Sequence, residues 1–221
     1  MNEFMQLFND SAPENVSTSV QLLLLLTVLS LAPSILILMT SFTRIVIVLS
    51  FVRTALATQQ MPPNQVIIGL SLFMTFFIMA PTFQEVNKTA LTPLFNEEIS
   101  LDQAYENAAV PFKEYMSKHT RQKDLALFLN YSGAETPKSI QDIPLTTLVP
   151  AYAISELKTA FQIGFMIFIP FLVIDMVVAS ILMSMGMMML PPVMISLPFK
   201  ILLFVMVDGW YLVVQSLLES F

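Results

Sequence analysis

The sequence lacks the residues that most catalytic and metal sites need. Its 221 residues include no cysteine, one histidine and five glycines. Without a thiolate there is no disulfide framework and no cysteine-based zinc or iron–sulfur site. Neither a G-x-G-x-x-G turn nor a phosphate-binding P-loop is present. His119 lies in a charged stretch with no nucleophile beside it, which predicts a solvated surface histidine. We therefore expect no enzyme, no cofactor and no metal.

Charge is scarce as well. Charged residues make up 12% of the chain and hydrophobic residues 56%, whereas a soluble domain has about 25% charged residues. The formal net charge of −6 argues against a nucleic-acid partner, which would require a basic face. The mean hydropathy of +0.74 indicates that most of the surface meets lipid or other apolar protein. These values predict an integral membrane protein.

The apolar residues gather in runs that are interrupted by proline. A spanning helix needs about 20 largely apolar residues, and four stretches qualify: 20–39 with its continuation 45–57, 66–83, 161–185 and 194–218. Pro33, Pro81 and Pro170 lie inside runs, and each removes a backbone hydrogen bond and kinks a helix. The pattern predicts an all-α, membrane-associated fold. Two arrangements stay open, an ordinary four-helix bundle and bent helical hairpins packed in a larger assembly.

We predict four segments along the chain. Residues 1–19 form an exterior segment, and their lack of Lys and Arg does not favour a cleavable signal. Residues 20–83 form a first helical hairpin, 84–155 a polar helical exterior domain and 156–221 a second hairpin. In the polar segment, Ser100 and Gln103 fit a capping box. Pro144 and Pro150 are expected to bound an extended connector, and Ser155 to cap the helix that follows.

Three charged residues stand where charge is expensive. Asp175 and Lys200 each interrupt an apolar run, and Asp208 lies further along the last one. A charge at the centre of a membrane helix costs about 2.5–3.5 kcal/mol, so such residues usually pair or line a wet cavity. Asp175 and Lys200 have similar depths if 187–190 is the tip of a hairpin, which makes pairing feasible. A stabilising ion pair and a role in conduction or proton coupling both stay open.

Methionine is concentrated in one place. Residues 183–194 read MSMGMMMLPPVM and hold six of the 16 methionines. Methionine is unbranched and re-packs without a fixed rotamer, so a ring of such side chains from several subunits would exclude water from a pore. The alternative is that methionine only fills a membrane core.

These features together resemble the FliP family, the main subunits of the core export gate in flagellar type III secretion, and their relatives in injectisomes. The motifs that carry the resemblance are TSFTRIVIVLSFVRTAL (40–56), PPNQVIIGLSLFMTFFIMAP (62–81), TRQKDLALF (120–128), the stretch 150–192 and LPFKILLFVMVDGW (197–210). They cover nearly the whole chain in order, and the SFTRI segment favours the flagellar branch.

The resemblance implies a structural role in a protein-conducting gate. Such subunits form a pentameric ring with FliQ and FliR, joined by FlhB and FlhA, in the bacterial inner membrane at the flagellar basal body. Unfolded flagellar proteins pass through the ring. The resemblance assigns Met187, Met188 and Met189 to a gasket around the closed channel, and Arg121, Glu156 and Lys158 to contacts between subunits. A different interpretation is a proton-coupled or small-solute transporter that uses Asp175 and Lys200.

Overall fold

The structure, a computed structural model, describes residues 23, 26, 27, 30, 33–58, 60–132, 137, 139–187 and 189–221. The chain divides into two compact units, Met1–Ile37 and Leu38–Phe221. Of the first unit only helical residues are described, and the predicted segment 1–19 lies outside the described residues. All further contacts are those of the second unit.

The described residues form helices and connecting turns, with no strand among them, which confirms the predicted all-α class. The helices of the second unit are α3 (Phe42–Ala55), α4 (Asn64–Val86), η1 (Asn87–Leu91, a π-helix), α5 (Thr92–Phe95), α6 (Leu101–His119), α7 (Gln122–Ser132), α8 (Leu145–Ser184), α9 (Pro192–Met206) and α10 (Gly209–Glu219).

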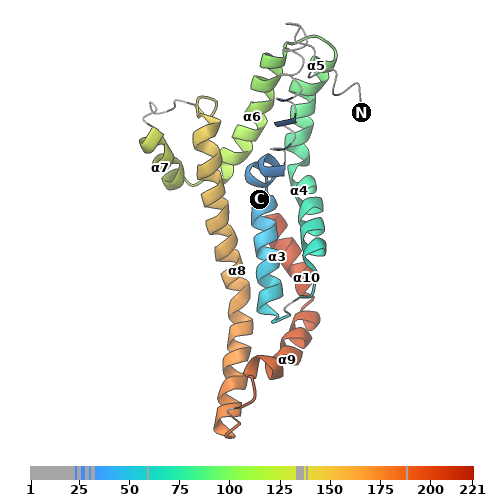
Figure 1. Cartoon of the computed structure of the whole chain (residues 1–221), viewed down its shortest axis with the longest axis vertical. Helices are drawn as coiled ribbons and strands as arrows, with labels where there is room; N and C mark the ends of the chain where they lie inside the picture. Colours follow the sequence, from blue (N-terminus) through green and yellow to red (C-terminus); the bar gives the residue numbers. More distant parts are fainter. Residues whose placement is uncertain are drawn as a thin grey trace, which may run out of the picture. The chain divides into compact units, whose positions relative to one another are not determined.

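Helix α3 is the centre of the second unit. It packs against α8 on one side and against α4 on the other, as Figure 1 shows. Ile45, Val48 and Val52 of α3 are completely buried, and Phe171 of α8 and Phe204 of α9 belong to the same apolar core. Gly164 of α8 permits this close packing, because a Cβ atom there would lie 2.5 Å from Cγ of Phe51.

Helix α8 is longer than the sequence pattern predicts. It runs without a break over 40 residues, about 60 Å at about 1.5 Å per residue. The predicted extended connector between Pro144 and Pro150 is wrong, because Pro144 precedes the helix and Pro150 lies in its second turn. Ser155 is accordingly a buried residue inside α8 rather than a cap. Packing of this part of α8 on α6 and α7 overrides the local proline signal.

Two other local predictions concern the polar segment. The capping box is confirmed, since Ser100 accepts the amide of Gln103 and the Gln103 side chain accepts the amide of Ser100. Helix α8 runs unbroken across the predicted boundary between residues 155 and 156. The division of the chain into four segments stays a prediction.

Among the described residues, two helices are apolar and long enough to cross a membrane, and the number rises to four if each of two bent helix pairs is one span. Two are continuous, Asn64–Phe95 and Leu145–Ser184. Two more are broken pairs, Pro33–Met39 with α3, and α9 with α10, which meet at an angle of 64°. The prediction of proline-broken, bent hairpins is confirmed at this level. Between α9 and α10, Asp208 takes a left-handed conformation with φ of 52°.

Candidate functional site: a methionine-rich tip and two buried ion pairs

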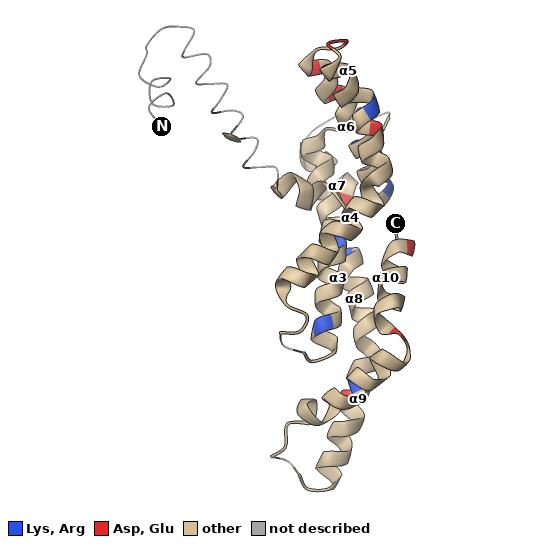
Figure 2. Cartoon of the chain, turned by 90° about the vertical axis from the view of Figure 1, so that its right-hand side faces the viewer, with Lys and Arg blue, Asp and Glu red and all other residues tan. Residues whose placement is uncertain are grey.

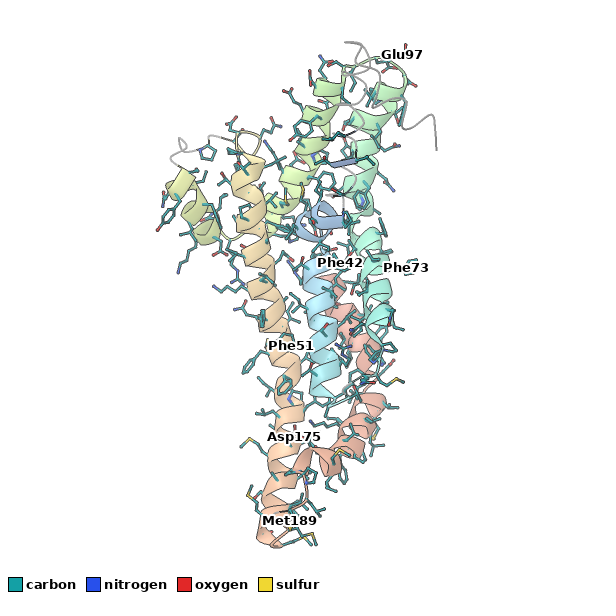
Figure 3. All side chains as sticks on the ribbon, viewed as in Figure 1. Phe42, Phe51, Phe73, Glu97, Asp175 and Met189 are labelled. Atoms are coloured by element: carbon teal, nitrogen blue, oxygen red, sulfur yellow. The ribbon has the colours of Figure 1, made fainter. Side chains whose placement is uncertain are left out.

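The α8–α9 hairpin ends in an exposed methionine loop. Helix α8 stops at Ser184 and α9 starts at Pro192, and Gly186, with φ of +73°, makes the turn that a side chain would strain. Met187 is 43% exposed and Met189 98% exposed. Figure 3 shows Met189 at the very end of the hairpin, while Met188 lies outside the described residues.

The hairpin beyond the ion pair is apolar throughout. Residues 176–199 contain no charged side chain, and Figure 2 shows neither blue nor red at the tip. A groove of about 460 Å³ between the two helices is lined by Val173, Ile174, Val177, Val178, Ile181, Leu182, Ile195 and Phe199. Large exposed apolar surfaces mark contacts with protein or membrane, so the tip is suited to contact with apolar protein or lipid.

The structure brings Asp175 and Lys200 together at the base of this hairpin. Nζ of Lys200 lies 2.6 Å from Oδ2 of Asp175, and Oγ of Ser196 donates to Oδ1 at 2.5 Å. Lys200 also donates to the carbonyl of Ala55 at 3.2 Å. That carbonyl is at the C-terminal end of α3, where a cation is favourable because the last carbonyls lack helical donors. The pair thus fastens α9 to both α8 and α3.

Asp208 has a different environment from this pair. It is exposed at the break between α9 and α10. In the part of the chain that the structure describes, it forms no ion pair. Its expected membership of the buried charge network therefore has no support in the described contacts.

A second buried ion pair joins α3 to α8. Nε and Nη2 of Arg44 donate to Glu156 at 2.7 and 2.5 Å, and the two side chains are 3% and 0% exposed. Nη1 of Arg44 donates to the carbonyl and hydroxyl oxygens of Ser220 at 2.6 and 3.0 Å. The guanidinium carbon lies 3.9 Å from the ring centre of Phe221. Arg53 of the same helix turns elsewhere, toward Oδ1 of Asn64.

The three expected subunit contacts, Arg121, Glu156 and Lys158, differ in how far the chain itself already uses them. Glu156 is unavailable to another chain in this structure, because its carboxylate is buried against Arg44 of its own chain. Nη2 of Arg121 is partly used within the chain, donating to Thr159 at 3.2 Å and Gln162 at 2.6 Å. Lys158 is exposed and remains free to meet a partner.

His119 is not a solvated surface residue, so that prediction is wrong. Its ring lies 4.8 Å from the ring of Tyr115 and 5.6 Å from that of Phe221. Burial, and then the positive charges of Arg44 and Lys118, lower the pKa of His119 to about 4. The spacing of four residues from Tyr115 was the available signal, because such residues share one face of a helix.

Sequence reasoning missed several partners of the two ion pairs. Ser196 stands four residues before Lys200, a spacing that could have revealed it. The Ala55 carbonyl and the residues Ser220 and Phe221 gave no such signal, since only the folded chain brings them to Lys200 and Arg44. Among the described residues, no group of three or more acidic or histidine side chains is placed to hold a metal ion.

Comparisons with known proteins agree on one family. Residues 25–217 match the FliP family. The flagellar biosynthetic protein FliP of Bacillus subtilis (strain 168) is 78% identical over 221 residues, which cover 100% of both chains. The proteins of that name from Caulobacter vibrioides and Aquifex aeolicus are 56% and 54% identical, over 91% and 94% of this chain and 76% and 87% of theirs. A match along nearly the whole length, at this identity, means that the chain belongs to the FliP family.

Proposed function

We propose that the chain is a structural, pore-forming subunit of the flagellar type III protein export gate. Its relatives are flagellar biosynthetic proteins, and its apolar helices are suited to a membrane location. In the proposed assembly, five copies form a ring with FliQ and FliR, and FlhB and FlhA adjoin it at the flagellar basal body. Unfolded flagellar proteins pass outward through the ring, and energy is supplied elsewhere in the apparatus.

The observation that carries this proposal is the exposed methionine tip. Met189 is 98% exposed at the end of a hairpin, and the 24 residues around it lack charge. A single chain gains nothing from presenting such a surface to water. Several tips that converge on one axis would bury one another and exclude water from a channel. Methionine would also re-pack around a passing chain at low cost.

The Asp175–Lys200 pair supports a structural role rather than a proton relay. Both carboxylate oxygens of Asp175 accept hydrogen bonds, from Ser196 and Lys200. Lys200 is 2% exposed. We assign the pair to holding the hairpin in position beneath α3, so that the methionine tip is presented at a fixed place.

The gasket is tested by ion leakage through the assembled gate. Replacing Met187, Met188 and Met189 together by alanine should raise the leak, because the smaller side chains leave a gap that water can fill. The matched control replaces Met61, Met166 and Met206, which are exposed and lie outside residues 176–199. If the tip variant leaks no more than the control and exports normally, the gasket assignment fails.

A further inference from the structure

An acidic groove lies on one side of the second unit. It has a volume of about 360 Å³, lies between α4, η1 and α6, and is lined by Glu85, Thr89, Asn107, Val110, Pro111 and Glu114. Nδ2 of Asn107 donates to the carbonyl of Thr89 at 3.0 Å and ties the two walls together. Glu85 and Glu114 are exposed, and neither forms an ion pair with any described residue, although Lys88 is one turn away.

A basic edge lies on a different surface, formed by α7 and α8. Its exposed residues are Lys123, Leu127 and Tyr131 of α7, and Leu157, Lys158 and Phe161 of α8. The α7 residues are spaced by four and form one stripe. Within the described part of the chain, neither lysine has a carboxylate partner. The carboxylate of Asp124, next to Lys123 in the sequence, already accepts a hydrogen bond from Ser155 at 2.7 Å.

We propose that the basic edge of one copy docks into the acidic groove of the next copy. The two surfaces are complementary in charge, and both place their charges beside apolar side chains. Burial of Leu127, Tyr131 and the half-buried groove wall Val110 supplies attraction. The opposite charges select the partner and its orientation.

The placement of the two surfaces determines which kind of assembly this contact forms. Helices α7 and α8 lie on one side of α3, and α4 lies on the other side of α3, as Figure 1 shows. A contact between two different surfaces is heterologous, and such contacts generate rings when the rotation closes. The inference rests on the proposed function, which requires several copies, and adds the two surfaces through which they meet.

Charge reversal tests the docking in the purified chain in detergent. One variant carries Glu85→Lys and Glu114→Lys, the other Lys123→Glu and Lys158→Glu. Each alone has two surfaces of like charge, so its mass should fall to that of a single chain at concentrations where the unmodified protein is assembled. Mixing the two variants should restore association, because each contact between unlike variants pairs opposite charges. A five-membered ring of mixed copies forms four of its five contacts in this way, so the mass should rise well above that of a single chain.

The control reverses Glu97 and Glu106, which are exposed outside the groove, and should keep the assembled mass. A second measurement does not depend on charge-reversed chains. The protein has no cysteine, so Glu114→Cys with Lys123→Cys and a short bismaleimide should give a ladder longer than a dimer.

Two outcomes overturn the docking surfaces. One is an assembled mass that no reversal changes, and the other is recovery that fails in the mixture while the cross-linked ladder is absent. Either result, with an assembled unmodified protein, leaves the proposed gate function standing. An unmodified chain that stays a monomer even with its partners refutes both.

Discussion

The buried pair of Arg44 and Glu156 allows a quantitative prediction. Arg44→Met removes two hydrogen bonds to Glu156 and two to Ser220, and leaves a carboxylate that is 0% exposed without its cation. Breaking one side of a buried ion pair typically costs about 3–5 kcal/mol. We expect that loss in the free energy of unfolding.

The double variant Arg44→Met with Glu156→Leu should be more stable than Arg44→Met by itself. Replacing both charges by apolar groups removes the unpaired carboxylate, and such replacements are often close to neutral. The remaining loss is that of the hydrogen bonds to Ser220, about 1 kcal/mol each. We expect a total of about 1–2 kcal/mol for the double variant.

The assay is reversible unfolding in detergent, followed by the fluorescence of Trp210, the one tryptophan in the chain. Its ring lies 5.4 Å from that of Phe204 in the core, so its emission reports tertiary packing. Arg53→Met is the matched control and should cost about 1 kcal/mol, because among the described residues Arg53 donates only to Asn64 and the Pro62 carbonyl. A double variant less stable than Arg44→Met would refute the reasoning.

Three further outcomes use the same unfolding measurement. Gly164→Ala should lose about 1–3 kcal/mol through the clash with Phe51, whereas Gly69→Ala, with open space around it, should gain about 0.5–1 kcal/mol; equal effects would contradict the packing. Ser100→Ala should cost about 1 kcal/mol by removing the cap, and no loss would show that the cap is dispensable. Because the pKa of His119 is lowered to about 4, the folded chain favours the neutral imidazole. Its contribution to stability is therefore fully present above about pH 6.5 and declines as the pH falls toward 4. His119→Phe should flatten that decline, and an unchanged profile would exclude the histidine as its source.

Local signals predicted the parts of the fold that depend on neighbouring residues. The apolar runs predicted the helices, and Ser100 with Gln103 predicted a helix start that the structure contains. The same local logic failed at Pro150, because packing on α6 and α7 keeps α8 helical through that residue. It also failed at His119, whose surroundings include Phe221, far away in the sequence.

The sequence predicted only some of the ion pairs between residues that lie far apart along the chain. The cost of burying a charge indicated that Asp175 and Lys200 each need a partner. A hairpin between them would place them at similar depths, which predicted the pair that the structure contains. The family resemblance assigned Glu156 to a contact between subunits, and only the packing of α3 on α8 revealed that its carboxylate faces inward to Arg44.

The sequence by itself determined the helical class, the membrane character, the family and the apolar methionine tip, since each follows from composition, periodicity or motifs along the chain. The tertiary structure alone decided the partners of Arg44, the anchoring of Lys200 to the Ala55 carbonyl, and the separation of the acidic groove from the basic edge. These features depend on which helix faces meet. Arg44 bonds the Glu156 side chain, and Lys200 bonds the Ala55 carbonyl, each more than 100 residues away along the chain. No local pattern encodes these contacts.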